Sequence, residues 1–261
     1  MNLSDLASLA EDLDHSRLFS QPRERLTAAY PDLALADGYK IQREGIKIRV
    51  DRGEKVIGYK MGLTSKAKME QVKLSSPIYG VLIDSALVKA NGPFSLSKSI
   101  HPKIEPEIAF VMGKDLSGKV SEEEALDACE YACGALEIID SRFLHFKYFS
   151  LPDVVADNCS AGYFALGPVV KNPKEIKLAE LEMKMKVNGQ LAQKAFSNSI
   201  LGNPIQSVVQ LCWLLHQEGL GLIKGQLVLA GAATQALALE PSMKVELSIQ
   251  DLGSFSLMVT E

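Results

Sequence analysis

The sequence predicts a single α+β domain that is rich in strands and carries a helical extension at its N-terminus. Apolar residues recur at helical spacing in the first 52 residues, whereas short runs with strand character dominate from residue 55 onward. No repeat, low-complexity segment or long Pro/Gly linker divides the 261 residues. We therefore expect an N-terminal helical extension over residues 1–54 and one continuous β-rich domain over residues 55–261.

Two helices are predicted in the N-terminal extension. Four leucines between Leu3 and Leu13 lie near helical spacing and predict a helix over residues 3–16. After a loop that contains two prolines, a second helical pattern covers residues 34–52 and ends before Gly53. These helices are expected to cap the β-rich body.

The body is predicted to consist mainly of strands. The Asn188-Gly189 dipeptide is typical of a two-residue hairpin turn. The predicted strands are short apolar or alternating runs that cover residues 55–61, 103–112, 134–140, 162–170, 181–187, 226–231, 243–250 and 254–260.

Two helices are predicted within the body. Ser121 and Glu124 form a capping-box pattern in front of a helix over residues 122–132. Asn203, followed directly by proline, predicts the start of the second helix, and Gly219 predicts its end.

Composition and charge exclude several classes of partner. The net charge is −4 and no dense Lys/Arg run occurs, so a nucleic acid or an anionic membrane is not expected as the main partner. No stretch approaches the roughly 20 apolar residues of a membrane helix, and the charged N-terminus does not resemble a signal peptide. We expect a cytoplasmic protein whose four cysteines are reduced and buried: Cys129 and Cys133, four apart in a helical pattern, and Cys159 and Cys212.

A pair of carboxylates stands out in the strand predicted over residues 103–112. Glu105 and Glu107 are two apart and would share one face of the strand, with apolar residues on the other face. Two carboxylates about 7 Å apart repel each other unless solvent or a cation lies between them. Pro106 predicts that the strand is locally unpaired or lies at an edge. The alternative is a half-exposed strand with a polar face.

Glu137 supports the interpretation that a cation lies beside Glu105 and Glu107. It lies in Ala135–Asp140, an apolar run that predicts a buried strand, where an unpaired carboxylate would cost several kcal/mol. Together with the first two carboxylates, Glu137 would give the oxygen donors that Mg²⁺ or Mn²⁺ prefers. The alternative for Glu137 is a buried ion pair with Lys60 or Arg142.

Other chemical motifs are weak. Lys60 lies in a Gly-flanked strand, where it could be a solvated side chain, bind a carboxylate substrate or relay a proton. Asp140 and Arg142 are expected to form a structural salt bridge. No GxGxxG, GxxxxGK[ST] or GxSxG motif occurs, and the four histidines show no metal spacing.

Six motifs, taken in their order along the chain, resemble those of a known family. They are Gly58–Ser65 (GYKMGLTS), Pro77–Gly80 (PIYG), His101–Phe110 (HPKIEPEIAF), Leu136–Arg142 (LEIIDSR), Val155–Ser160 (VADNCS) and Gly231–Thr234 (GAAT). Together they resemble the 2-oxopent-4-enoate hydratase / 4-oxalocrotonate decarboxylase family of the fumarylacetoacetase-like fold group, over nearly the whole chain. The resemblance implies a mixed β-roll or barrel of the fumarylacetoacetase C-terminal type with flanking helices. It also implies a Mg²⁺ or Mn²⁺ site on Glu105, Glu107 and Glu137.

The decarboxylase branch of this family is favoured by one position. Hydratases of the family typically carry an Asp in Pro-Asp-Tyr/Phe-Gly, whereas this chain has Ile78 there, and isoleucine cannot transfer a proton. The segments Ile139–Phe149 and Val154–Asn158 also look like the decarboxylase. Leu201–Pro204 departs from the Gly-His-Pro that the family predicts.

The decarboxylase branch implies a small 2-oxo dicarboxylic acid as substrate. This would be 4-oxalocrotonate (2-oxohex-3-enedioate), converted to 2-hydroxypenta-2,4-dienoate and CO₂ in the meta-cleavage catabolism of aromatic hydrocarbons. We expect Lys60 and Ser160 to act as catalytic polar contacts. Leu63, Ile78 and Thr234 are expected to bind the substrate, with Ile78 helping to keep water from the diene.

Three alternatives stay open. The nearest is a hydratase that adds water to 2-hydroxypenta-2,4-dienoate, and a more distant one is a C–C hydrolase that would need a His-Glu pair, for which His101 is the nearest histidine. The third is a non-catalytic, metal-binding partner subunit of the hydratase. The family further implies a homo-oligomer and a possible complex with the pathway hydratase.

Overall fold

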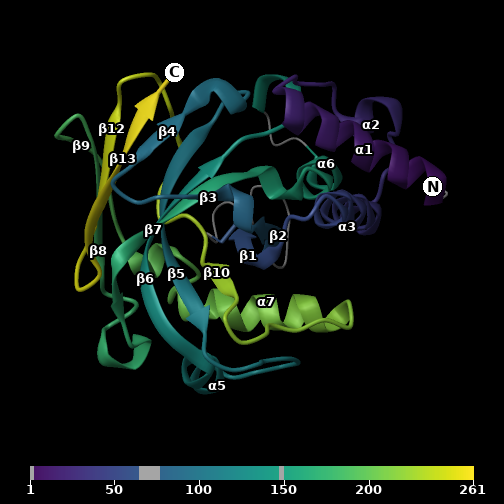
Figure 1. Cartoon of the computed structure of the whole chain (residues 1–261). Helices are drawn as coiled ribbons and strands as arrows, with labels where there is room; N and C mark the ends of the chain where they lie inside the picture. Colours follow the sequence, from purple (N-terminus) through teal and green to yellow (C-terminus); the bar gives the residue numbers. More distant parts are fainter. Residues whose placement is uncertain (1–2, 65–76, 147–149) are drawn as a thin grey trace.

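Two β-sheets packed face to face form the body of the structure (Figure 1). The chain is represented by a computed structural model that describes residues 3–64, 77–146 and 150–261. Within these ranges the larger sheet has eight strands and the smaller has five. The larger sheet runs, in spatial order, through β2 (Ile78–Ile83), β1 (Val56–Gly62), β10 (Leu227–Leu229), β5 (Lys103–Met112), β6 (Cys129–Ile139), β7 (Ala161–Lys171) and β3 (Leu87–Val88), with β11 (Leu237–Ala238) paired to β5.

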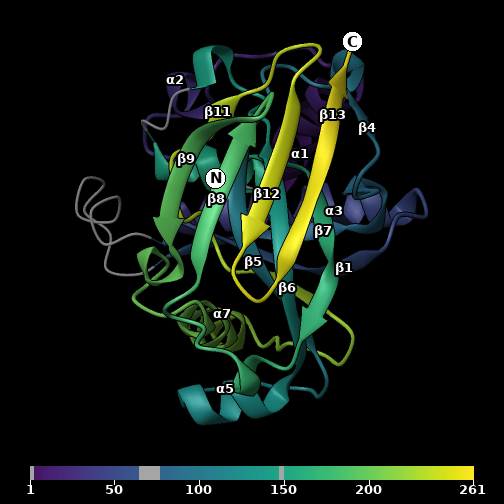
Figure 2. The ribbon, with the colours of Figure 1, turned by 90° about the vertical axis from the view of Figure 1, so that its left-hand side faces the viewer.

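The smaller sheet covers one face of the larger sheet, as Figure 2 shows. Asn188 and Gly189, both with positive φ (51° and 80°), form the tight turn predicted between β8 and β9. The strands of this sheet run in the order β4 (Pro93–Ser95), β13 (Gly253–Thr260), β12 (Lys244–Ile249), β8 (Glu182–Val187) and β9 (Gln190–Phe196).

Helices gather in two places around the sheets (Figure 1). One group contacts the β1–β2 side, and the other lies beneath the two sheets. The first group is α1 (Leu3–Phe19), α2 (Leu26–Ala29), α3 (Leu35–Asp51) and α6 (Leu151–Ala156); the second is α5 (Glu122–Ala128) and α7 (Ile205–Gln217). No helix within the described ranges has the length and apolar character to cross a bilayer.

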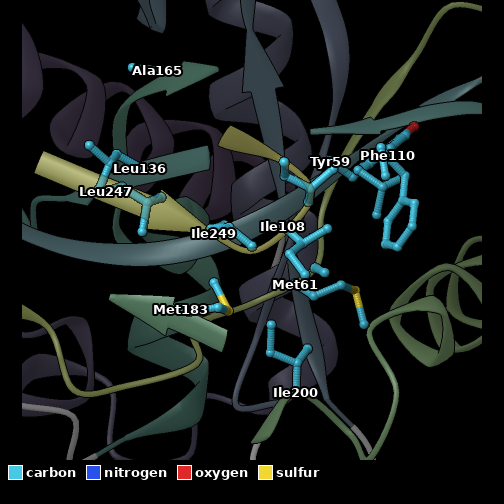
Figure 3. Packing of buried hydrophobic residues seen from close by; sticks show 14 of the residues in the cluster. Tyr59, Met61, Ile108, Phe110, Leu136, Ala165, Met183, Ile200, Leu247 and Ile249 are labelled. Carbon is cyan, nitrogen blue, oxygen red and sulfur yellow. The ribbon is translucent and has the colours of Figure 1, made fainter. Parts of the chain in front are cut away.

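The main core lies between the two sheets (Figure 3). Ile108 of β5 and Leu136 of β6 lie near Leu247 and Ile249 of β12, and Phe110 of β5 belongs to the same core beside Tyr59. Because side chains alternate along a strand, the residues between these point to the opposite face of the larger sheet. The opposite face of β5 and β6 is also buried, which explains why both strands have apolar residues on two sides.

The structure confirms the predicted α+β class and the main predicted elements, with one correction. The helix predicted over residues 122–132 ends at Ala128, because Cys129 leaves the helical conformation (φ −80°, ψ 133°) and pairs with Met112. Cys129 and Cys133 therefore lie on β6 rather than on a helix. Strands β2, β3, β4 and β11 and helices α2 and α6 were not predicted, since most are too short to show a hydrophobic period.

Pro106 occupies an interior strand, so the prediction of an edge is wrong and that of local unpairing is right. On one side Pro106 faces Leu136 of β6. On its other side β5 pairs with β10 at residues 109–111 and with β11 at residues 103–104, which leaves a gap. Ala233 N donates to Pro106 O at 3.2 Å across this gap. A residue without an N–H is tolerated there because no strand is present to accept from it.

The N-terminal helices dock through an apolar contact and a charged cluster. Leu6 and Leu9 of α1 and Ile41 of α3 pack against Phe143 and Ala156 of the body. The charged cluster ties the C-terminal ends of both helices to the start of β1. It consists of Asp14, Arg17, Arg49, Arg52 and Glu54. The division into residues 1–54 and 55–261 stays a prediction.

Glu54 should make the stability of the protein depend on pH. Burial raises the pKa of Glu54, but hydrogen bonds from Arg49 and Ser85 and the charges of Arg49 and Arg17 lower it to about 2, against 4.5 in the unfolded chain. A depressed pKa stabilises the fold above the unfolded value, and this contribution is lost as pH falls from about 4.5 toward 2. Because solvent screens part of these interactions, Glu54→Gln should lower the free energy of unfolding by roughly 1–2 kcal/mol at pH 7, less than the full shift implies.

Urea denaturation of wild type and variant between pH 7 and 3 measures this difference. The two curves should converge below pH 4.5, and Glu246→Gln on the smaller sheet provides a control of equal charge change. A difference that is the same at pH 7 and pH 3 would contradict the role given to the Glu54 carboxylate.

Candidate metal centre

Three glutamates meet on the face of the larger sheet that is turned away from the smaller sheet. Glu105 and Glu107 lie two apart on β5, and Glu137 of β6 lies directly opposite Glu105 in the strand register. Alternation along both strands places all three on one face. One carboxylate oxygen of each lies within 4.8 Å of the other two, and all three side chains are buried. The structure therefore brings together the three residues that the sequence singled out.

Lys60 reaches the same place from β1. Its Nζ lies 2.8 Å from Glu137 Oε1 and donates a hydrogen bond to Cys159 O at 3.2 Å. The predicted alternative of an ion pair between Glu137 and Lys60 is thus present, but the ion pair with Arg142 is not. Arg142 instead pairs with Asp157, so the predicted salt bridge with Asp140 is also wrong.

The electrostatics of the cluster leave a negative excess. Within the described residues, three carboxylates and one ammonium carry three negative charges and one positive charge, which leaves two negative charges if all are ionised. Burial, then the charges of Glu137 and Glu105, raises the pKa of Glu107 well above its usual value. For Lys60 burial lowers the pKa, but the three glutamates outweigh it and the net shift is upward. Lys60 is therefore held in its charged form.

These residues fit a divalent cation. Oε1 of Glu107 and Oε2 of Glu137 are buried and accept no hydrogen bond from the described residues. Buried carboxylate oxygens without donors are costly, and a cation of charge +2 would match the excess charge. Hard oxygen donors of this kind suit Mg²⁺ or Mn²⁺.

Backbone groups of two loops support the cluster. Gly231 N donates to Glu107 Oε2 at 2.8 Å. Gly231 has φ +101°, and a Cβ there would lie 2.2 Å from Thr64 Oγ1, so no other residue fits. The loop that contains Gly231 also supplies the Ala233 N–H that bonds to Pro106 O. The gap beside Pro106 thus admits the loop that orients Glu107.

The segment Asn158–Ser160 presents the carbonyl group that accepts from Lys60. Asn158, Cys159 and Ser160 have φ of 49°, 52° and 56°, a left-handed conformation that is unfavourable for residues other than glycine. The Asn158 amide holds the segment against β2, since its Oδ1 accepts from Val81 N at 2.7 Å and its Nδ2 donates to Val81 O at 2.9 Å. Ser160 is buried beside this turn, and its carbonyl accepts from Asp140 N at 2.8 Å.

The sequence of the chain matches one protein-family model. The family model described as fumarylacetoacetate (FAA) hydrolase C-terminal matches residues 54–260. The chain belongs to the fumarylacetoacetate hydrolase family.

Individual members of this family are similar over nearly the whole chain. A 4-oxalocrotonate decarboxylase of Pseudomonas sp is 40% identical over 255 residues, which cover 98% of each chain. The solved structure of 4-oxalocrotonate decarboxylase from Pseudomonas putida G7, complexed with magnesium and adipate, matches with a TM-score of 0.96 and 34% identity, over 99% of this chain and 98% of that chain. A 2-hydroxyhexa-2,4-dienoate hydratase of Comamonas testosteroni is 33% identical over 239 residues, which cover 90% of each chain.

The expected substrate-binding residues of this family member lie in two places. Ile78 is buried with Val154, Val155 and Cys159, and Leu63 (φ 58°) packs against this group. Cys159 joins it to the metal cluster through its carbonyl group. Thr234 is partly exposed, and its hydroxyl donates to the side chain of Gln193 and to Gln235 O rather than to the glutamates. Ser65 and Lys147–Phe149 of the motifs lie outside the described residues.

His101 does not form the His-Glu pair that the C–C hydrolase alternative needs. Its ring packs against Phe146, with ring centroids 5.3 Å apart, and its backbone N–H donates to Asp140. Neither of these contacts involves a glutamate side chain. Asn158 and Gly231 are the supporting residues that sequence reasoning missed, although both lie within motifs that it quoted.

Glu107→Gln should weaken metal binding by this family member without lowering its stability in the absence of metal. In metal-free protein the neutral amide removes a buried charge and can still accept from Gly231 N, so the free energy of unfolding should be unchanged or raised, by up to about 3 kcal/mol. Mg²⁺ should raise the melting temperature of wild type but not of the variant, because a ligand that binds only the folded state stabilises it.

Thermal denaturation with EDTA and with a Mg²⁺ titration measures both effects, with Glu246→Gln as the matched control. A variant that is clearly less stable without metal and still responds to Mg²⁺ would show that Glu107 has a structural role only.

Proposed function

We propose that this protein is a metal-dependent 4-oxalocrotonate decarboxylase, a carbon–carbon lyase of meta-cleavage aromatic catabolism. The observation that carries the proposal is the convergence of three buried carboxylates beside a buried lysine. The relatives with this name match almost end to end, at 40% and 37% identity. The hydratases that match are less similar, at 33% and below.

The substrate chemistry explains why such a site is needed. 4-Oxalocrotonate is a vinylogous β-keto acid, so cleavage of the bond to its distal carboxylate releases CO₂ and leaves an electron pair. The pair moves through the conjugated chain to the 2-oxo oxygen, and protonation of that oxygen from solvent gives 2-hydroxypenta-2,4-dienoate. Mg²⁺ or Mn²⁺ held by Glu105, Glu107 and Glu137 would supply positive charge for the 1-carboxylate and the 2-oxo oxygen.

The polar residues of the chain itself bind and orient the substrate in this proposal. Lys60 keeps its positive charge, since the glutamates raise its pKa, and it can attract an anionic oxygen of the substrate. Its ammonium group is fixed by Cys159 O and Glu137, so little reorganisation is required when charge develops. Ser160 offers a hydroxyl on the same turn.

The apolar residues limit the reaction to loss of CO₂. Ile78 and Leu63 pack with Val154 and Val155 where the hydratases of the family are expected to hold an acid–base Asp. A buried isoleucine neither activates water nor donates a proton, and it favours loss of charge from a desolvated carboxylate. The hydratase is therefore the second candidate, and position 78 is the observation that disfavours it. We also keep Thr234 in the proposal, as a substrate contact at the edge of the site.

The assembly and location of the protein are further parts of the proposal. The adipate in the Pseudomonas putida G7 complex is a small dicarboxylic acid, which supports a small acid as substrate here. A homo-oligomer, a complex with the pathway hydratase and a cytoplasmic location stay predictions made from the sequence. The alternative of a non-catalytic partner subunit predicts metal binding without any turnover.

Metal removal and Glu105→Gln should both abolish most of the activity. The protein supplied with 4-oxalocrotonate and Mg²⁺ should release CO₂, and the variant should lower kcat by at least about 10²-fold because one anionic ligand is lost. CO₂ release is followed by a coupled assay, with Glu246→Gln as a control that should stay near wild type. Full activity in EDTA-treated protein would contradict the proposal.

Ile78→Asp tests the apolar position. The aspartate should reduce CO₂ release by at least about tenfold, since a polar group in this pocket admits water. Ile78→Val, which shortens the side chain but keeps it apolar, should retain most of the activity. Both variants are offered 4-oxalocrotonate and 2-hydroxypenta-2,4-dienoate, and products are separated by chromatography. Equal CO₂ release by Ile78→Asp and wild type would show that the apolar side chain has no such role.

A further inference from the structure

A second cavity lies outside the metal centre, where the ends of α1 and α3 meet the body. Its volume is about 310 Å³, enough for a small organic anion or phosphate. In addition to the two helix ends, its wall comes from η1 (Asp84–Ala86), η2 (Leu96–Lys98), the end of β6 and the start of β7. Helix α1 contacts both α3 and η2. None of the expected substrate-binding residues lines this cavity.

The side chains that line the cavity include more cations than carboxylates. Within the described residues, four cations line it, Arg17, Arg49, Lys98 and Arg142, against the single carboxylate of Asp140. That carboxylate already accepts from the backbone N–H groups of Ile100 and His101, at 2.9 and 2.8 Å. Its single negative charge offsets one of the four positive charges that line the cavity.

The two arginines of the N-terminal helices are bound along one edge only. Arg17 uses Nε and Nη2 for Asp14, at 3.3 and 3.0 Å, and Arg49 uses Nε and Nη2 for Glu54, at 3.1 and 2.7 Å. Asp14 and Glu54 do not line the cavity. The Nη1 of each arginine has no hydrogen-bond partner in the described part of the chain. Both guanidinium groups thus keep donors that a ligand can use.

Arg17 and Arg49 also repel each other. Burial, and then the charge of Arg49, lowers the pKa of Arg17, although Asp14 and Glu54 act in the opposite direction. A guanidinium whose charge is disfavoured by its surroundings gains more from an added anion than one that is already neutralised. Arg142 also lines the cavity, but its guanidinium is paired with Asp157, which offsets its charge.

Two further donors face the same space. Lys98 lies exposed on the rim and has no ion-pair partner among the described residues. The ring of Tyr163 packs against Phe94 with centroids 5.2 Å apart, and its hydroxyl makes no hydrogen bond within the described part of the chain. Guanidinium, ammonium and phenol donors around one cavity are the set that binds carboxylate and phosphate oxygens.

We propose that this cavity binds a small dianion, either a phosphate or a dicarboxylate. The site is distinct from the metal centre, because the space between them is a cavity of about 10 Å³ that touches Glu137 and holds no more than one water. Arg49, Gly162 and Tyr163 line both spaces. A bound dianion would therefore not contact Glu137, which does not line this cavity, and it would not enter the reaction.

Binding of sodium phosphate and of succinate to metal-free protein tests the proposal. Removing the metal prevents chelation of either anion at the glutamates, and titration calorimetry at constant ionic strength gives the affinity. At least one of the anions should bind saturably with one site per chain. Phosphate alone, succinate alone or both would each support the proposal and identify the ligand chemistry.

Lys98→Met and Tyr163→Phe test whether the anion binds in this cavity. Each removes one donor without touching the arginine pairs that hold the helices, and each should weaken binding by at least about fivefold. Lys89→Met, which removes an exposed lysine outside the cavity, should leave the affinity within about twofold of wild type. The proposal is overturned if neither anion saturates, or if Lys98→Met and Lys89→Met bind equally well.

Discussion

Three carboxylates and one ammonium group meet in a buried part of the protein from which water is largely excluded. The neighbouring groups of the site offset the repulsion between the three carboxylates. Glu107 is fully buried, and the two neighbouring carboxylates disfavour its ionised form. Lys60 offsets one negative charge, through Glu137. Keeping such a cluster without a ligand costs stability, and a divalent cation bound between the carboxylates would offset that cost.

The backbone around the cluster is correspondingly specialised. Gly231 adopts a conformation and a close contact that no other residue allows, and its N–H orients Glu107. Asn158 fixes a left-handed segment whose carbonyl group holds Lys60. Pro106 lies where the ladder of β5 is interrupted, so that the Gly231 loop can approach. Local strain of this kind persists only where the surrounding structure over-determines it, which is typical of functional sites.

Much of the fold and the centre of the site could be predicted from the sequence, and particular residues show why the rest could not. The period of two in β5 and the apolar run around Glu137 predicted a shared buried face, because alternation is a local property of strands. The end of the helix at Ala128 was missed, since only pairing with Met112 decides that Cys129 is a strand residue. The partner of Arg142 and the cavity beside Arg49 depend on contacts between distant segments, which no local pattern encodes.

The most direct test of the central claim is a crystal structure of the protein grown with Mn²⁺ and oxalate, an inert mimic of the 2-oxo acid end, with the metal located by its anomalous signal. We predict one peak about 2.1 Å from an oxygen of each of Glu105, Glu107 and Glu137, with oxalate in the remaining positions. A peak elsewhere, or glutamates bonded only to Lys60 and other protein groups with no metal between them, would contradict the account.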